Sequence, residues 1–329
     1  MATIKEIAKR ASVSRTTVSR VINNSGYVSE DAKKRVLKAI EETGYIPSEN
    51  AKSLRTKKTK VIGVILPKIS TETSSRLVKG LDEVFAKEGY QILLTNTNLD
   101  PEKEIEYLRL LKSRHVDGII LSATIINEPL VEEINQLNIP FVTVGQHISG
   151  ISNVLFDDYQ AAKDMVYLMI KKGYKEIAFI GVDEEDHSVG YLRKMGYLDA
   201  MKENNLPVEE SWVQKGIFDV DSGYQCMSQM MKFSIQKPVA VLAVTDRLAI
   251  GAIQYMKEAG LSIPDEMAVA GMGASELSRF ISPPLTTIDF SIEEVGSKAA
   301  DLLLEQINGR NSHDKISKIK YRLIERSSI

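Results

Sequence analysis

The sequence lacks the residues from which disulfides and membrane spans are built. Cys226 is the single cysteine among 329 residues, so no intrachain disulfide can form, and a reducing compartment is indicated. The longest apolar stretch, residues 238–244, is far too short to cross a bilayer, and residues 1–10 carry charges among their apolar positions, unlike a signal peptide. We therefore expect a soluble protein of the cytoplasm, with Cys226 as a small core residue.

The motifs of common enzyme classes are also missing. The four histidines show no metal-ligand spacing, and the chain has neither a phosphate-binding loop nor a nucleophile elbow. Gly271-Met272-Gly273 lacks the third glycine of a dinucleotide fingerprint. The acidic run Asp183-Glu184-Glu185-Asp186-His187 is expected to be a solvated loop, because metal ligands are normally spread over a turn. We predict no enzyme activity, no cofactor and no metal.

Charge is small in total but uneven along the chain. The formal net charge is −2, yet residues 1–60 hold 14 Lys and Arg against six Asp and Glu. A basic N-terminal segment on an acidic body indicates that this segment alone meets a polyanion such as DNA. The length of 329 residues predicts about two domains.

Three short helices are expected in the first 46 residues. Thr3 can cap a helix with an i, i+3, i+4, i+7 apolar stripe, and Ser14 can cap a second helix that runs to about Asn23. Ser29 can cap a third helix, which Gly44 ends. Two short helices joined by a tight turn in a basic segment suit the major groove of DNA, and a helical hairpin with a solvated basic face is the alternative.

The second of these helices carries side chains suited to DNA. Arg15 and Thr16 lie in its first turn and Arg20 lies further along, and arginine can bond both acceptors of the guanine edge. Short hydroxyl and amide side chains suit phosphate oxygens. The predicted DNA-binding residues are Thr3, Ser14, Arg15, Thr16, Thr17, Ser19, Arg20, Asn23 and, in the following linker, Leu54.

Strands and helices alternate from residue 61 onward. Most of the expected strands are short, nearly continuous apolar runs rich in β-branched residues, which is typical of strands buried on both faces. They are residues 61–66, 91–95, 118–122, 141–144, 177–181, 239–244, 267–271 and 286–290. Amphipathic helices between most of them predict an α/β fold with parallel sheets. Because there are too many strands for one compact sheet, we expect two similar lobes.

The N-terminal residues also resemble a known family. Thr3-Ile4-Lys5-Glu6-Ile7-Ala8 and Ala11-Ser12-Val13-Ser14-Arg15-Thr16-Thr17-Val18-Ser19-Arg20-Val21-Ile22-Asn23 are similar to the helix-turn-helix headpiece of the lactose-repressor (LacI/GalR) family. Ser12 departs from the glycine usual in the turn. The resemblance extends over essentially the whole chain, because the α/β remainder resembles the family's two-lobed, periplasmic-binding-protein-like effector domain.

The resemblance implies a domain organisation and an assembly. The headpiece is residues 1–46, the hinge is 47–59, and the ligand-binding and dimerisation domain is 60–329, with lobes of 60–157 plus 290–320 and of 158–289 plus 321–329. Arg15 and Thr16 match positions that select the operator, and Arg20 matches another base-reading arginine. Leu54 is then a wedge in the minor groove that kinks the duplex, although a residue packed under the headpiece is the alternative.

A ligand site is expected between the lobes, at the strand ends where open α/β sheets bind ligands. The run 70–75, with Thr71, Thr73 and Ser74, offers hydroxyls at a helix start for a sugar or a phosphate, unless it is only a capping loop. Asp157 follows a strand-like segment. By resemblance, Arg193 is a ligand contact, Phe218 stacks on the ligand ring or is a core residue, and Thr245-Asp246 faces the ligand.

One position departs from many relatives in this cleft. Gly273 stands where they place an acidic ligand contact, which removes one carboxylate and favours a phosphorylated sugar as a hypothesis. The sequence as a whole predicts a homodimeric repressor of carbohydrate-utilisation genes. It binds a palindromic operator in double-stranded DNA and is released by a sugar or sugar phosphate, with no membrane partner. The alternatives are a pleiotropic regulator with a protein or phosphorylated corepressor, and a sugar receptor that does not bind DNA.

Overall fold

The fold is taken from a computed structural model that describes residues 2–45, 58–234, 237–310 and 314–329. The chain divides into two compact units, Met1–Thr59 and Lys60–Ile329. Each unit has its own hydrophobic core. The two units are therefore described one at a time.

The first unit is a three-helix domain. It contains α1 (Ile4–Arg10), α2 (Arg15–Ile22) and α3 (Glu30–Thr43). The side chains of Thr3, Ser14 and Ser29 each accept a backbone N–H in the first turn of the helix that follows, as expected. Ile7, Val18 and Val36, one from each helix, are fully buried together.

The turn between α1 and α2 uses an unusual backbone conformation. Ser12 has a φ of +51°, in the left-handed region that normally favours glycine. The turn is closed by a hydrogen bond from the N–H of Val13 to the carbonyl of Ala8. Serine therefore keeps the turn geometry at some conformational cost.

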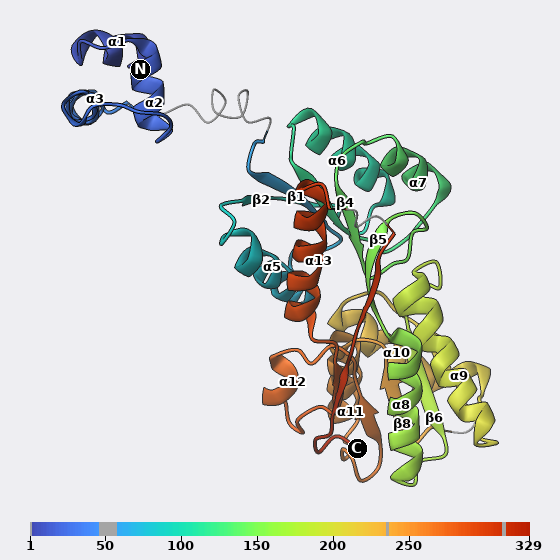
Figure 1. The fold of residues 1–329 in the computed structure, drawn as a ribbon. Helices are drawn as coiled ribbons and strands as arrows, with labels where there is room; N and C mark the ends of the chain where they lie inside the picture. The colour runs from blue at the N-terminus through green and yellow to red at the C-terminus, as the bar shows by residue number, and fades with distance from the viewer. Residues whose placement is uncertain (1, 46–57, 235–236, 311–313) are drawn as a thin grey trace. The chain divides into compact units, whose positions relative to one another are not determined.

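A six-stranded parallel sheet forms the first lobe of the second unit. Its strand order is β11-β5-β4-β3-β1-β2. The strands are β1 (Val61–Leu66), β2 (Gln91–Asn96), β3 (Gly118–Ser122), β4 (Phe141–Val144), β5 (Ser152–Phe156) and β11 (Ile316–Ile319). Helices α5 (Glu72–Phe85) and α13 (Ile292–Ile307) cover one face, and α6 (Pro101–Ser113) and α7 (Glu128–Asn135) cover the other (Figure 1).

Burial on both faces explains why β1 is apolar throughout. Ile62, Val64 and Leu66 belong to the core cluster that includes residues of α5 and α13. Ile65 belongs to the separate cluster that includes residues of α6 and α7. Successive side chains of a strand point to opposite faces, so a strand with helices on both sides must be apolar at nearly every position.

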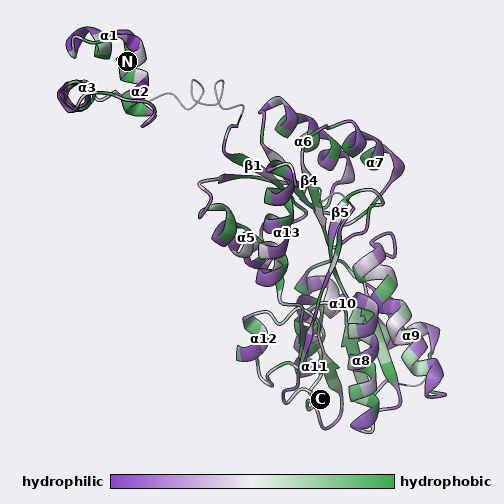
Figure 2. Cartoon of the chain, in the orientation of Figure 1, coloured by the Kyte–Doolittle hydropathy of each residue, from purple (hydrophilic) through white to green (hydrophobic). Residues whose placement is uncertain are grey.

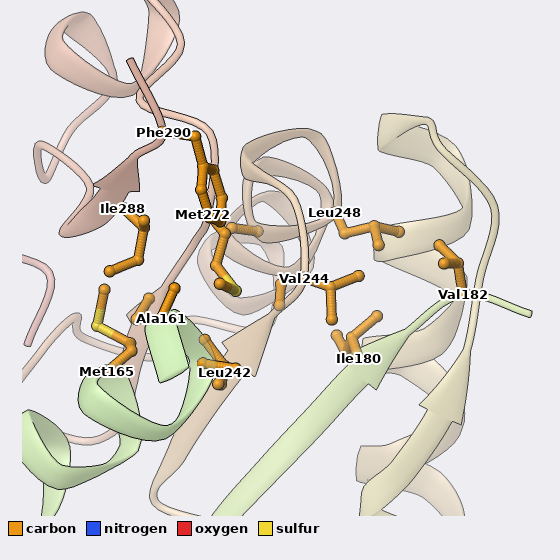
Figure 3. Packing of buried hydrophobic residues seen from close by; sticks show 14 of the residues in the cluster. Ala161, Met165, Ile180, Val182, Leu242, Val244, Leu248, Met272, Ile288 and Phe290 are labelled. Atoms are coloured by element: carbon orange, nitrogen blue, oxygen red, sulfur yellow. The ribbon is translucent and has the colours of Figure 1, made fainter. Parts of the chain in front are cut away.

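A smaller parallel sheet forms the second lobe, in the order β7-β6-β8-β9. Its strands are β6 (Ile177–Gly181), β7 (Val213–Lys215), β8 (Ala240–Ala243) and β9 (Ala268–Ala270). The helices α8 (Asp158–Lys171), α9 (Arg193–Glu203), α10 (Val220–Phe233) and α11 (Asp246–Glu258) pack around it. Figure 3 shows Ile180, Val182, Val244 and Leu248 gathered near the carboxyl ends of β6 and β8, all within one buried cluster.

Short elements complete the second lobe. A π-helix spans His187–Leu192, a 3-10 helix spans Glu210–Trp212, and α12 is Leu277–Phe280. Strand β10 (Thr287–Asp289) pairs in antiparallel fashion with β12 (Arg322–Ile324). Ala270 forms a parallel bridge with Thr286, which brings this pair to the edge of the small sheet.

The chain passes between the lobes three times. It crosses between β5 and α8, between β10 and α13, and between β11 and β12. From these crossings we propose that the lobes comprise 60–157 with 290–320 and 158–289 with 321–329. The headpiece of residues 1–46 and the hinge of residues 47–59 stay predictions, and nearly all of the hinge lies outside the described residues.

The predicted α/β class with parallel sheets is confirmed. Apolar colour concentrates on the strands and polar colour on the outer helix faces (Figure 2). Strands β5, β7, β11 and β12 were not among the expected strands. Of these, β7 and β11 lie at sheet edges and β12 pairs with β10, and all three have partly exposed, polar positions. No helix in the described ranges is long and apolar enough to cross a membrane.

Candidate functional site

Helix α2 presents a polar face that the headpiece core leaves open. Val18 is fully buried, and Val21 and Ile22 pack against the same core. Arg15, Thr16 and Arg20 are all exposed. Thr16 and Arg20 are four residues apart and share the face opposite Val18, and Arg15 lies in the first turn of the helix, so these side chains can meet one groove of DNA together.

The other headpiece candidates are partly engaged in local hydrogen bonds. Ser14 Oγ accepts the N–H of Thr17 at 3.0 Å and lies 2.9 Å from Thr17 Oγ1. Asn23 Nδ2 donates to the carbonyl of Ser19 at 2.6 Å. Thr3 shares a capping box with Glu6. These residues set the helix starts and the turn that position Arg15 and Thr16, and Leu54 lies outside the described residues.

A cavity of about 200 Å³ lies between the two lobes of the second unit. Both lobes contribute to its wall, mostly at the carboxyl ends of strands and the starts of the helices that follow, as open α/β sheets require. Seven of the eight predicted ligand residues line it: Thr71, Thr73, Ser74, Arg193, Phe218, Thr245 and Asp246. Apolar surface from Phe156, Phe218 and Phe290 adds aromatic faces.

Arg193 is held in place by a buried carboxylate. Its Nε and Nη2 both lie 2.7 Å from Oδ1 of Asp158, and its Nη1 donates to the carbonyl of Val244. Its guanidinium lies 4.5 Å from the ring centre of Phe290. Arg193 is 6% exposed and Asp158 is 1% exposed, so the charge of this arginine is neutralised before any ligand arrives.

Asp157 is directed elsewhere. It is the residue before α8, its carboxylate lies 2.9 Å from Lys318 Nζ, and it is not among the residues that line the cavity. Asp158, the next residue, is the one that turns inward to Arg193. The sequence placed an acidic side chain at this strand end one residue too early, because two adjacent aspartates before a helix do not reveal which of them faces inward.

Asp246 belongs to the cavity wall but also to its scaffold. Thr287 Oγ1 donates to its Oδ1, and the N–H of Ser275 donates to its Oδ2 at 2.6 Å. Burial raises the pKa of Asp246, and these hydrogen bonds oppose that rise. Thr245 caps α11 by accepting the N–H of Leu248. Thr245 and Asp246 thus fix the edge of β8 as well as facing the cavity.

The start of α5 forms another part of the wall. Thr71 caps the helix by accepting the N–H of Ser74 and donates to the carbonyl of Lys68 at 3.0 Å. Ser74 is buried, whereas Thr73 is exposed. This run is therefore a capping loop that also lines the cavity, and its contact with a ligand stays a prediction.

Two sets of hydrogen bonds join the lobes beside the cavity, and the sequence did not indicate either. Arg76 on α5 donates to the carbonyls of Gly273 and Ala274 at 3.2 and 3.3 Å and pairs with Asp289. Gln146, just after β4, donates to Asp186 at 2.8 Å. The sequence did not predict these contacts, because each joins residues at least 40 positions apart.

Arg76 also contacts the backbone at Gly273, where the sequence departs from the pattern that the resemblance implies. Gly273 has a φ of +139°, and its carbonyl accepts a bond from Arg76. Although burial would raise the pKa of Asp289, the bonds from Arg322, the N–H of Ser291 and Arg76 lower it. The guanidinium of Arg76 is thus already matched by a carboxylate.

The cavity gives no sign of metal or covalent chemistry. Within residues 2–45, 58–234, 237–310 and 314–329, no group of three or more His, Cys, Asp and Glu could hold a metal ion. Cys226 is buried, and burial raises the pKa of its thiol to about 11. This arrangement can bind and orient a small polar ligand between two lobes.

The comparisons with known proteins match both units. Residues 3–48 match the family model described as bacterial regulatory proteins, lacI family, and residues 166–329 match a periplasmic binding protein-like domain. The chain is 36% identical over 324 residues to the HTH-type transcriptional repressor PurR of Actinobacillus pleuropneumoniae serotype 3 (strain JL03), covering 98% of this chain and 94% of the relative.

Solved structures agree on the fold. A transcriptional regulator CelR–cellobiose complex is 25% identical, covers 100% of both chains and has a TM-score of 0.77. A Lac repressor dimer bound to operator and the anti-inducer ONPF is 24% identical, covers 99% of this chain and 98% of its own, and has a TM-score of 0.91.

Proposed function

The chain belongs to the lacI family of bacterial regulatory proteins, and we propose that it is a repressor of carbohydrate-utilisation genes that a small effector releases from its operator. It acts in the cytoplasm on double-stranded DNA and is not an enzyme. The observation that carries this proposal is the exposed set Arg15, Thr16 and Arg20 on α2, in a unit separate from the one that holds the cavity.

The DNA contacts divide into two roles. Arg15, Thr16 and Arg20 reach base edges, since all three are exposed and two of them lie in the first turn of the helix. The other contacts are to phosphate oxygens: Thr3 and Ser14 cap α1 and α2, Thr17 and Ser19 lie within α2, and Asn23 is its C-cap. Leu54 opens a base step in the minor groove.

A homodimer reads a palindrome with its two headpieces. The second unit offers apolar side chains for such an interface: Leu93 and Leu94 on the edge strand β2 are 38% and 37% exposed. Leu277 and Phe280 on α12 are 63% and 73% exposed. Apolar residues gathered at a sheet edge and on one short helix are typical of a surface that another chain covers.

The effector binds in the cavity between the lobes and changes their closure. Thr71, Thr73, Ser74, Arg193, Phe218, Thr245 and Asp246 supply the polar and aromatic contacts. The cellobiose complex of a CelR regulator with the same fold supports a carbohydrate ligand. When the effector changes the affinity for the operator, the operator must change the affinity for the effector by the same factor.

Operator selection tests the DNA half of this proposal. Full-length protein is used to select duplexes from a random pool, and the selected sequences are expected to show twofold symmetry. Arg15→Ala should relax the choice of base in each half-site and weaken selected binding by about 10–100-fold. Lys87→Ala, an exposed basic residue of the second unit, is the matched control. Selection without symmetry, or an unchanged pattern in the Arg15 variant, would contradict the assignment.

The effector half is tested on the same complex. Saccharides that raise the melting temperature of the protein are added to the protein–operator complex, and fluorescence anisotropy follows release of the duplex. An inducer lowers operator affinity. A ligand that binds but leaves operator affinity unchanged would reject this mode of regulation.

A further inference from the structure

One residue of the acidic run 183–187 is not solvated. Asp183, Glu184, Glu185 and His187 are exposed as expected, but Asp186 is only 5% exposed and lines the cavity. The loop turns tightly here: a Cβ on Gly190 would lie 1.9 Å from the carbonyl oxygen of Asp183. Asp186 also caps the π-helix His187–Leu192. The prediction of a solvated loop was therefore wrong for this residue.

The carboxylate of Asp186 has one engaged oxygen and one open oxygen. Its Oδ1 accepts the N–H of Val189 at 2.9 Å and Nε2 of Gln146 at 2.8 Å. Among the residues that the structure describes, none donates to Oδ2, which is also not one of the fully enclosed unbonded atoms. A nearly buried carboxylate on the cavity wall therefore keeps an acceptor free for whatever enters the cavity.

Gln146 of the opposite lobe fixes the orientation of this carboxylate. Its Nε2 also donates to the carbonyl of Thr124 at 2.8 Å, and its Oε1 accepts Ser188 Oγ at 3.2 Å. The single hydroxyl hydrogen of Ser188 is shared with the carbonyl of Gly145, which lies nearer, at 2.6 Å. Because these contacts hold the amide in place, Oδ1 of Asp186 stays bonded to Gln146, and Oδ2 is left as the unbonded oxygen of a residue that lines the cavity.

The charges around the cavity do not suit an anion at this place. Asp246 is a second buried carboxylate on the wall, and two of the three arginines there, Arg193 and Arg76, are already paired with Asp158 and Asp289. Lys68 and Arg247 also line the cavity but remain half-exposed, where solvent screens them. Burial raises the pKa of Asp186 to about 6, so its carboxylate is mostly charged at neutral pH.

We propose that Asp186, oriented by Gln146, is a specificity-determining residue of the cavity: it accepts a hydrogen bond from a hydroxyl or N–H of an uncharged effector and rejects an effector with a phosphate at that position. This inference rests on the proposed function in assuming that the cavity binds the effector. It also replaces the earlier hypothesis of a phosphorylated sugar. That hypothesis rested on the lack of a carboxylate at Gly273, but Asp186 supplies a carboxylate to the same cavity.

The experiment compares matched ligands on matched variants. The probes are uncharged mono- and disaccharides, the 6-phosphate of each hexose in the set, and two uncharged purine bases. Melting temperatures are measured for the full-length protein, and ligands that raise them are titrated by calorimetry. The variants are Asp186→Asn, Asp186→Ser and, as control, Glu185→Gln, which neutralises the exposed neighbouring residue.

The expected result is a shift with an uncharged saccharide and a binding constant at least about tenfold weaker for its phosphate. Asp186→Asn should keep the bonds to Val189 and Gln146 through its carbonyl oxygen. Its NH2 group, a hydrogen-bond donor, then takes the place of the free acceptor Oδ2. It should therefore lower the preference for the uncharged ligand by about tenfold or more. Asp186→Ser removes the carboxylate entirely, and it is the variant to measure if the asparagine variant does not fold. Glu185→Gln should bind like the wild type.

Several results would overturn the inference. They are tighter binding of a sugar phosphate by the wild type, unchanged selectivity in both Asp186 variants, or no shift with any uncharged probe. A purine base whose binding depends on Asp186 would support the role of this residue while contradicting the carbohydrate effector of the proposed function. A saccharide that binds through Asp186 without changing operator affinity would reject the proposed regulation alone.

Discussion

Glu104 is a carboxyl group that folding removes from water. It lies in the first turn of α6, is 2% exposed, and its Oε2 is a fully buried oxygen without a hydrogen-bond partner in the described part of the chain. Burial raises its pKa to about 8. At neutral pH the folded protein therefore holds this group mainly in its protonated form, whereas the unfolded chain releases the proton.

Replacing Glu104 with glutamine should remove a pH dependence of stability. Because the folded pKa is raised, the stabilising contribution is complete below about pH 4.5 and is lost as the pH rises to about 8. In the wild type this group lowers the free energy of unfolding by up to about 1.4 kcal/mol per pH unit over that range. Urea unfolding at pH 5.5 and 7.5 measures the slope, which should be flatter in Glu104→Gln. Glu106→Gln, exposed on the same helix, should keep the wild-type slope.

The pair of Arg193 and Asp158 sets how the arginine can be tested. Arg193→Met would leave the carboxylate of Asp158 buried without its cation, which should cost about 3–5 kcal/mol of unfolding free energy. Adding Asp158→Asn should restore part of that loss, because a neutral amide is less costly to bury. Urea unfolding of the two variants checks this. Equal destabilisation of the single and double variants would mean that the two residues are not coupled. Ligand binding without Arg193 should be measured in the double variant, which leaves no unpaired buried carboxylate.

Single side chains are also where sequence reasoning failed. Arg193 and Phe218 lie on the cavity wall where the motifs put them, but the bonding state of Arg193 depends on Asp158, 35 positions away. Asp186 was expected to lie in a solvated loop because all five residues of the run are polar, and its four neighbours are indeed exposed. Local pattern does not show which member of a polar run faces inward, since that is decided by contacts distant in sequence.

At the scale of elements, glycines set how closely helix pairs approach. A Cβ on Gly80 of α5 would lie 2.0 Å from the carbonyl oxygen of Glu293 in α13. The same holds between α10 and α11, where a Cβ on Gly223 would lie 2.3 Å from the oxygen of Leu248 and one on Gly251 would lie 2.0 Å from that of Val220. The helix backbones therefore touch at points where no side chain fits.

Gly251→Ala should separate α10 from α11 and destabilise the second lobe. A methyl group at this contact meets backbone rather than a flexible side chain, so we expect a loss of at least about 1–3 kcal/mol. The gain in helix propensity from alanine, about 1 kcal/mol, offsets only part of it. Urea unfolding measures the change, with Gln254→Ala on the exposed side of α11 as control. A stability equal to that of the wild type would show that the helices part without cost.

Strands that are buried on both faces were predicted from the sequence better than strands that are partly exposed. The expected boundaries of β1, β3, β4 and β6 agree with the structure, because both faces of these strands are covered and their sequences are continuously apolar. Strands β7 and β11 lie at sheet edges, and β12 pairs only with β10, so half of their positions remain polar. Helix caps at Thr3, Ser14 and Ser29 were equally readable, since each is set within four residues.

At the scale of the whole molecule, the uneven distribution of charge predicts that salt affects operator binding much more than effector binding. Residues 1–60 carry the excess of Lys and Arg, although the full chain has a net charge of −2. Operator affinity should therefore fall steeply with salt, by about 10³-fold or more between 50 and 200 mM for six or more phosphate contacts. Effector affinity should change little, because the cavity arginines are paired. Anisotropy and calorimetry across a salt series measure both. A flat operator profile would contradict phosphate contacts by the headpiece.

The three crossings between the lobes constrain how the protein can fold while it is being synthesised. The first lobe needs β11 for one edge of its sheet, and the second lobe needs β12 and Ser328, whose hydroxyl donates to the carbonyl of Val269. Neither lobe can be completed until residues 316–328 have left the ribosome, so most of the chain must wait with unfinished sheets. Chaperone dependence of the nascent chain should therefore extend until residues 316–328 have been made, and of these parts only the headpiece can complete its fold earlier.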